Sequence, residues 1–320
     1  DETRTYRRQM TDLSDSGYVV VLGGANADIT GFSSARLRPR DSNPGSIDVS
    51  CGGVARNVSE NLARLGVDSR LMTLVGNDQY GEMILALSRS AGIDMQYTQT
   101  THSAPTSSYL SILDETGDMS VAIADMAIME HITPEWLSRQ RDAFQHASMI
   151  VIEANLPAAS VEWVANEFSH CPIFADTVSA SKAASLKTSL GAIHTLKTNA
   201  LEAESLAGTG TELAAIADSL HGEGIERLFI TRGADGVFYS TPDGRGDLTP
   251  ARNKGPMHNS GGAGDAFLAG ICYAWLADWS LEETARFSMA AAEVTAAARA
   301  TSSAAFSLAA INRVLGKQDA

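Results

Sequence analysis

Short apolar runs rich in β-branched residues alternate with helical stretches from Tyr18 to Thr231, and this alternation limits the folds open to the chain. Continuous apolar runs of this kind are typical of buried parallel strands. Strands that alternate with helices build a parallel sheet with helices on both faces. The sequence therefore predicts an α/β fold, a three-layer α/β/α domain with a mainly parallel central sheet. The predicted strands are 18–22, 69–75, 147–153, 172–176, 193–197 and 227–231, and the predicted helices are 54–65, 134–145, 160–168, 201–207, 211–221 and 266–276.

Two segments interrupt the alternation and predict a small β-sheet lid that projects from the main domain. Residues 35–50 contain Pro and Gly and are expected to be irregular. Residues 106–125 show a period-two pattern on both sides of a turn at 114–117, which is typical of a hairpin with one exposed face. We expect the lid to be formed by about 35–50 and 100–128, and its exposed sheet is a candidate homodimer surface.

Net charge and cysteine content limit the classes of partner and the cellular setting that the chain can have. A formal net charge of −14 argues against nucleic acid or an anionic membrane as a partner. ATP stays open, because backbone amides and Mg²⁺ can hold phosphates without a basic surface. Cys51, Cys171 and Cys272 are far apart and odd in number, and no apolar run reaches membrane-spanning length, so a reducing, cytoplasmic setting is expected. The polar residues 1–16 are expected to be a flexible arm before a domain over 17–320.

A glycine-rich segment near the C-terminal end predicts an anion site. Gly262, Ala263 and Gly264 allow a tight turn with several free N–H groups, and an apolar helix follows. Free N–H groups at the positive end of a helix dipole bind anions. Asp265 stands beside them, where it could take a proton from a hydroxyl that attacks a phosphoryl group held by the amides. The alternative is a glycine-rich loop in which Asp265 caps the helix.

Polar residues follow the first strand and open the first helix, and they are candidates for a sugar site. Ligands collect at the carboxyl ends of parallel strands. Asn26 and Asp28 face one side of an extended chain, and Asp28 could accept hydrogen bonds from a vicinal diol; an Asx-turn is the alternative. Gly52 and Gly53 would let a sugar ring approach the backbone, with Asn57 one turn into the helix. A plain helix start is the alternative here.

Two later segments are candidates for the nucleotide. Asn199 and Glu202 lie three residues apart at a helix start, where they could hold waters around Mg²⁺; a capping box is the alternative. Thr231, Gly233 and Gly236 follow a strand and suit nucleotide phosphates or ribose. The chain has no P-loop motif, and no dinucleotide fingerprint follows the first strand.

These motifs occur in a characteristic order: Gly-Gly-x-x-x-Asn ending at Asn57, Asn-x-x-Glu beginning at Asn199, and Gly-Ala-Gly-Asp ending at Asp265. In this order they resemble the ribokinase family, also called the PfkB carbohydrate kinases, over about residues 17–315. Within the family, the chain is most similar to members that phosphorylate pseudouridine. The stretches that carry this closer similarity are 24–28, 41–45, 106–111, 122–126 and 193–197.

The resemblance implies a ribokinase-like fold and transfer of the γ-phosphoryl group of ATP to the 5′-hydroxyl of a nucleoside, with Mg²⁺ as cofactor. Asp265 would be the base, and the amides of Gly262, Ala263 and Gly264 the anion hole. Substrate would be bound by residues of the first loop, the paired glycines, the lid and a strand end, namely Asn26, Asp28, Gly52, Gly53, Asn57, Ser108 and Asn155. The nucleotide would be bound by Asn199, Thr231, Gly233 and Gly236, with Glu202 serving the metal through water.

Departures from the family pattern and the lid composition refine this expectation. Asn259-Ser260-Gly261 stands where the family often has Asp-Thr-Thr, which disfavours activation by K⁺, and Thr177 and Thr198 replace common prolines. The lid segment 106–126 has no Arg or Lys, which favours a neutral acceptor over a sugar phosphate. Another nucleoside or ribose is the alternative acceptor. A catalytically silent nucleoside-binding protein is the alternative of another class, and the presence of Asp265 argues against it.

Overall fold

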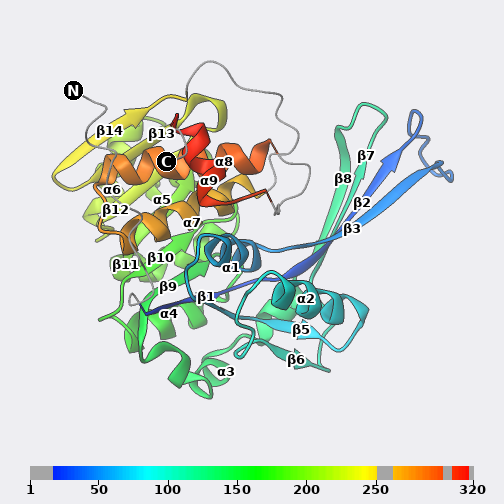
Figure 1. Ribbon diagram of the computed structural model, residues 1–320, viewed down its shortest axis with the longest axis horizontal. Helices are drawn as coiled ribbons and strands as arrows, with labels where there is room; N and C mark the ends of the chain where they lie inside the picture. The colour runs from blue at the N-terminus through cyan, green and yellow to red at the C-terminus, as the bar shows by residue number, and fades with distance from the viewer. Residues whose placement is uncertain (1–16, 251–261, 298–304, 317–320) are drawn as a thin grey trace.

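A central sheet carries the main domain of the protein, whose computed structural model describes residues 17–250, 262–297 and 305–316. Its strand order is β14-β13-β12-β11-β10-β9-β1-β4 (Figure 1). The strands from β4 to β12 run parallel, and β13 and β14 add an antiparallel edge. The predicted mainly parallel sheet is therefore confirmed. The bounds are β1 Tyr18–Leu22, β4 Ser69–Met72, β9 Ala147–Glu153, β10 Ile173–Asp176, β11 Ile193–Asn199, β12 Arg227–Thr231, β13 Val237–Thr241 and β14 Gly244–Leu248.

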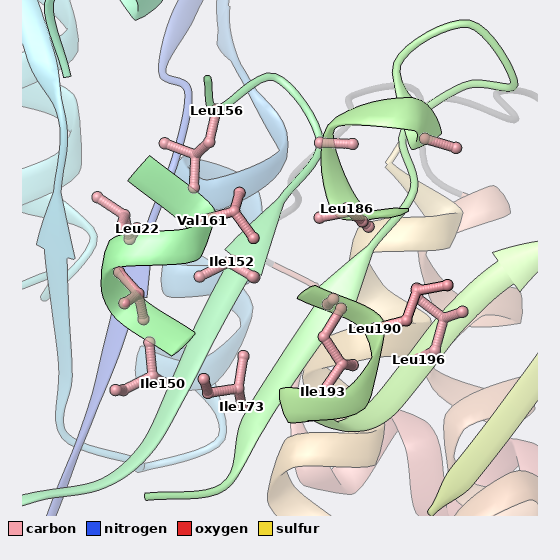
Figure 2. Close-up of a cluster of buried hydrophobic side chains, with 14 of the residues drawn as sticks. Leu22, Ile150, Ile152, Leu156, Val161, Ile173, Leu186, Leu190, Ile193 and Leu196 are labelled. Atoms are coloured by element: carbon pink, nitrogen blue, oxygen red, sulfur yellow. The ribbon is translucent and has the colours of Figure 1, made fainter. Parts of the chain in front are cut away.

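Helices cover both faces of this sheet because successive strand residues point to opposite sides. Val19, Val21 and Val151 pack with α1, α7 and α8 in one buried cluster. Leu22 and Ile152 face the other side, toward α4 and the η4 segment (Figure 2). The predicted three-layer arrangement is confirmed. The bounds are α1 Val54–Arg64, α4 Ala158–Glu167, η4 Ala183–Ala192, α5 Ala200–Ala207, α6 Leu213–Gly222, α7 Ala263–Leu276, α8 Leu281–Ala296 and α9 Leu308–Val314.

A second sheet forms the lid and projects from the main domain (Figure 1). Its order is β3-β2-β7-β8, and the predicted hairpin corresponds to β7 and β8. The expectation that residues 35–50 are irregular is wrong for their second half, because β3 pairs antiparallel with β2 along its whole length. β3 contains glycine, serine and aspartate, which are uncommon in strands, so its sequence does not show a strand pattern. Pairing with the neighbouring strand stabilises it instead. The bounds are β2 Asn26–Ser33, β3 Gly45–Gly52, β7 Ser108–Leu113 and β8 Met119–Asp125.

Two predicted elements are divided in the structure. The strand expected over 69–75 changes sheets at Thr73, because Met72 pairs with β1 whereas Leu74 pairs with β6. The helix expected over 134–145 stops before Gln140, which leaves the helical region at φ −118° and ψ 23°. The remaining elements are β5 Leu74–Gly76, α2 Gln79–Ser90, β6 Gln99–Thr101, η2 Ala127–His131, α3 Pro134–Ser138, η3 Arg141–Phe144 and η5 Gly233–Asp235.

A polar junction at Asp78 ties the lid to the main domain. Asp78 caps α2 by accepting from the Gly81 amide at 2.9 Å. The same carboxylate accepts from the amide of Thr106 at 2.8 Å and from its hydroxyl at 2.7 Å, just before β7 begins. No helix within the described ranges is both long and apolar enough to cross a bilayer.

Candidate active site

Three charged side chains form a row at the carboxyl ends of neighbouring parallel strands. Glu153 on β9 lies directly opposite Asp176 on β10, which lies directly opposite Lys197 on β11. Partners in register share one face of a sheet, and this is the face that α1 and α7 cover. All three side chains are buried, and Lys197 Nζ donates to Asp176 Oδ2 at 2.8 Å. The row forms the floor of the candidate site.

The first turn of α7 lies above this floor and approaches it closely at Gly264. Gly262 is the N-cap at φ 75°, a left-handed conformation that favours glycine, and no side chain of the described residues caps the helix there. A Cβ atom on Gly264 would lie 2.8 Å from Lys197 Nζ, so glycine is needed for this close approach. The leading N–H groups of a helix have no partner within it. This backbone geometry is compatible with an anion hole, which stays a prediction.

Asp265 points away from its own helix and into the site. Its Oδ2 accepts from Asn57 Nδ2 at 2.9 Å, although the two residues are far apart in sequence. Gly262, not Asp265, holds the N-cap position, so the capping interpretation is wrong. Burial raises the pKa of Asp265 to about 7, and Asp176 adds to the rise, while Asn57 and Lys197 oppose it. A carboxyl group with a pKa near neutrality suits a general base.

Asn57 is held between the candidate base and a buried cation. Arg56 Nη1 donates to Asn57 Oδ1 at 3.2 Å, which directs the amide nitrogen to Asp265. Arg56 itself pairs with Glu60 at 2.5 Å one turn along α1. The sequence predicted Asn57 as a ribose contact. The structure adds a second task, because this amide orients Asp265.

The paired glycines and the start of β2 meet as predicted. Asn26 and Asp28 share one face of the strand and contact each other, so the Asx-turn alternative is wrong. A Cβ atom on Gly52 would lie 2.1 Å from Asp28 Oδ2. Gly53 has φ 98°, and a Cβ atom there would lie 2.5 Å from the carbonyl oxygen of Gly24. Burial raises the pKa of Asp28 to about 6, although Asn26 and Arg56 oppose the rise. A carboxylate lined by bare backbone is suited to bind a diol.

Glu153 is a site residue that sequence reasoning did not assign. Its Oε1 accepts from the Gly24 amide at 2.7 Å, and its Oε2 accepts from the amide and side chain of Asn155 at 2.7 Å and 2.6 Å. Lys182 Nζ donates to Asn155 Oδ1. The predicted substrate contact Asn155 is thus held in place on both sides. The sequence held one sign of this contact, the pair Gly23-Gly24 after the first strand. Glycine is found there because a Cβ atom on Gly23 would lie 2.5 Å from Glu153 Cγ.

Asn199 and Glu202 form the reciprocal capping box that was the alternative to a metal site. Asn199 Oδ1 accepts from the Glu202 amide at 2.9 Å, and Glu202 Oε2 accepts from the Asn199 amide at 3.0 Å. Thr177 Oγ1 also donates to Glu202 Oε2 at 2.5 Å. The described residues contain no cluster of three or more His, Cys, Asp or Glu that could hold a metal ion directly. The role of Glu202 toward a metal through water stays a prediction.

The predicted nucleotide turn lies beside the capping box. Thr231 is directly opposite Asn199 in register and donates to the Thr198 carbonyl at 3.1 Å. Gly233 and Gly236 have φ 57° and 95°, and a Cβ atom on Gly236 would lie 1.9 Å from the Leu248 carbonyl oxygen. These glycines close the β12–β13 connection and bring it to the same sheet edge.

The register of the lid separates Ser108 from the other predicted substrate residue of the lid, Asp28. Ser108 lies opposite Ala27, whereas Tyr109 lies opposite Asp28. Because side chains alternate along a strand, Tyr109 shares the face of Asp28 and Ser108 does not. Asn259, Ser260 and Gly261 and the arm 1–16 lie outside the described residues.

The two faces of the lid differ in chemistry. The face of Asp28 carries Thr30 and Ser111, whose hydroxyls lie 3.2 Å apart. Opposite partners on the other face form the apolar row Val49, Ile29, Leu110 and Ile123 across all four strands.

Comparison with known proteins places this geometry in a family. A model of the pfkB family carbohydrate kinases matches residues 16–306. The chain belongs to this family. The kinase is 39% identical over 279 residues to a pseudouridine kinase of Escherichia coli, covering 86% of this chain and 89% of that protein. It is 37% identical over 292 residues to the uncharacterized sugar kinase YeiI of the same organism, covering 89% and 80%.

A solved structure of a carbohydrate kinase from Agrobacterium tumefaciens superimposes on this kinase with a TM-score of 0.84 at 30% identity, over 94% of this chain and 97% of that one. The predicted ribokinase-like fold and family are confirmed. The chain is a carbohydrate or nucleoside kinase, a phosphotransferase.

Proposed function

We propose that this kinase transfers the γ-phosphoryl group of ATP to the 5′-hydroxyl of pseudouridine. The observation that carries the proposal is Asp265, a buried carboxylate in the first turn of α7 that is hydrogen-bonded to Asn57. A base beside an anion hole is the arrangement that phosphoryl transfer to a hydroxyl needs. Burial raises the pKa of Asp265 to about 7, which suits a general base.

The proposed reaction uses this chain's own groups in fixed places. Asp265 takes the proton of the acceptor hydroxyl as its oxygen attacks phosphorus, and the amides of Gly262, Ala263 and Gly264 bind the negative oxygens of the transferred group. Mg²⁺ bound with ATP would neutralise phosphate charge, and Asn199 and Glu202 would hold its waters. Both carboxylate oxygens of Glu202 already accept hydrogen bonds, at 2.6 Å and 2.5 Å, which supports contact through water.

Asp28 and the polar lid face support a nucleoside acceptor. Asp28 would accept from the ribose hydroxyls, and Tyr109, Thr30 and Ser111 share its face above them. The match to a pseudouridine kinase over most of both chains supports this base. YeiI is almost as similar, so another nucleoside or a free sugar is the second candidate acceptor.

We also propose that a second copy of the chain covers the apolar face of the lid. Exposed fractions reach 41% for Val49, 36% for Leu110 and 64% for Ile123, and the next row adds Ile47 and Val121. A continuous apolar sheet face is typical of an interface. Ile123→Asp should shift the protein toward monomer in light scattering after size exclusion, whereas Glu115→Gln in the exposed turn should not. A wild-type monomer at micromolar concentration would contradict this proposal.

The experiment for the function is a coupled assay of ADP release with one acceptor at a time. Pseudouridine, uridine, adenosine, inosine, ribose and fructose 6-phosphate should be compared by kcat/KM, with Asp265→Asn as the enzyme control. We expect pseudouridine to give the highest value. Equal or faster turnover of ribose would show that the base is not recognised, and would contradict the proposal.

A further inference from the structure

Lys197 is a buried cation for which the reaction above has no task. Its side chain lies at the carboxyl end of β11, with an exposed fraction of 8% for the residue. A lysine ammonium group has three donors. Among the described residues, one hydrogen bond accounts for this group, the 2.8 Å bond to Asp176. Burying an ammonium is costly, so a function for its remaining N–H groups is worth seeking.

The position of the ammonium group relates it to the anion hole. A Cβ atom on Gly264 would lie 2.8 Å from Lys197 Nζ, so the ammonium touches the first turn of α7. A cation at the positive end of a helix is unfavourable unless anions accompany it. Burial opposes its charge, but Asp176, Asp265 and Glu202 outweigh burial and raise the pKa of Lys197. Lys197 is therefore charged where the anion hole opens.

Asp176 fixes the ammonium in this position. Its Oδ2 accepts from Lys197, and its Oδ1 accepts from the Val178 amide at 2.7 Å. Val178 has φ 59°, an unusual conformation for a β-branched residue. Both carboxylate oxygens are thus engaged, and the turn after β10 is shaped around them. The ammonium has little freedom to move away from α7.

The surrounding charge explains why the site needs a cation here. Asp265, Asp176 and Glu153 are buried close together and would repel the oxygens of a γ-phosphate. Helix amides alone carry only about half a unit of positive charge. Lys197 is bonded to Asp176 and lies beside Gly264, so it can offset the field of these carboxylates at the first turn of α7.

We propose that Lys197 is a catalytic residue that donates hydrogen bonds to the transferred phosphoryl group, and that Asp176 is its positioning residue. The inference rests on the proposed kinase reaction. The acceptor oxygen forms a bond to the γ-phosphorus, the bond to the ADP oxygen breaks with its electron pair, and the acceptor proton goes to Asp265. Lys197 keeps its proton throughout and stabilises the charge on the phosphoryl oxygens.

The test compares nucleotide binding and turnover in Lys197→Met, with Lys187→Met on the exposed surface as a control. A lysine that contacts the γ-phosphoryl should matter for a non-hydrolysable ATP analogue (AMP-PNP) but not for ADP. We expect calorimetry to give roughly tenfold weaker binding of the analogue and nearly unchanged ADP binding, on the order of one charged hydrogen bond. We expect kcat to fall by about 10²-fold or more. Lys187→Met should match wild type.

A second variant protects the test against a fold defect. Lys197→Met alone leaves Asp176 buried without its partner. The double variant Lys197→Met/Asp176→Asn removes both charges and should fold while keeping the kinetic and binding losses. Equal loss of analogue and ADP binding, or a double variant within threefold of wild-type kcat, would overturn the proposal. The binding comparison needs no acceptor, so it also tests Lys197 if wild type fails to phosphorylate pseudouridine, a result that would contradict only the proposed substrate.

Discussion

The floor of the site and the lid are both β-structure, but they hold their polar groups in opposite ways. On the floor, Glu153, Asp176 and Lys197 are buried and bonded to one another or to backbone. On the lid, polar and apolar side chains alternate on a sheet of which much is exposed. Buried groups with fixed partners suit chemistry that needs exact charge placement. An exposed sheet tied down at Thr106 suits recognition and closure.

The largest effect should come from Asp265, which lies in the first turn of α7 directly above the floor. Asp265→Asn keeps the shape but cannot accept a proton, so kcat should fall by about 10²-fold or more in steady-state assays. Acceptor and nucleotide affinities should change far less.

Thermal unfolding at pH 8 provides a control for this variant. Burial raises the pKa of Asp265 to about 7, above its value in the unfolded chain. Stability from this group is therefore present at low pH and is lost as pH rises through about 7. The asparagine variant should unfold at an equal or higher temperature. If the variant retained most of the wild-type kcat, Asp265 would not be the base.

A smaller effect is expected from Asp28, which lies at the start of β2 where the lid begins. Asp28→Asn weakens the acceptor for the ribose diol, and we expect acceptor KM to rise about tenfold or more, as for a hydrogen bond to a charged group. The KM for ATP should stay within about twofold of wild type. If both KM values rise together, Asp28 serves the whole site, and the division between chemistry and recognition fails.

The smallest effect should come from the lid alone. Tyr109→Ala, or a shortened turn between Asp114 and Gly117, should alter acceptor KM by severalfold, or kcat through impaired closure, more than it alters ATP binding. Tyr109→Phe is the matched control for the ring without its hydroxyl. Unchanged acceptor kinetics in all three variants would mean that the hairpin serves structure or assembly and not the substrate.

The same contrast explains what could be predicted from the sequence. Parallel strands such as Val19–Leu22 of β1 are buried on both faces, and their continuous apolar pattern is visible without a structure. Asp265 and the glycines before it are local in sequence, so the motif alone is enough to predict an anion hole. β2 and β3 were missed because their residues contain glycine, serine and aspartate, and pairing with neighbours forms them.

Contacts between residues far apart in the chain could not be predicted from the sequence. Glu153 and Lys197 each end an apolar run, and in sequence such residues mark only where a strand reaches solvent. Their role appears when strand register aligns them with Asp176. The bond between Asn57 and Asp265 joins α1 to α7 in the same way. Strand register also decides that Tyr109, and not Ser108, shares the face of Asp28, which the sequence pattern alone does not show.

The central claim is that Asp265, held in the first turn of α7 above the floor, removes the acceptor proton, and the pH dependence of kcat/KM tests this claim most directly. The base must be ionised, and its pKa is raised to about 7. We predict a rate that increases about tenfold per pH unit below 7 and levels off above it. Asp28→Asn should keep this limb, since burial raises the pKa of Asp28 only to about 6. Asp265→Asn should lose it. An unchanged limb in Asp265→Asn would contradict the account.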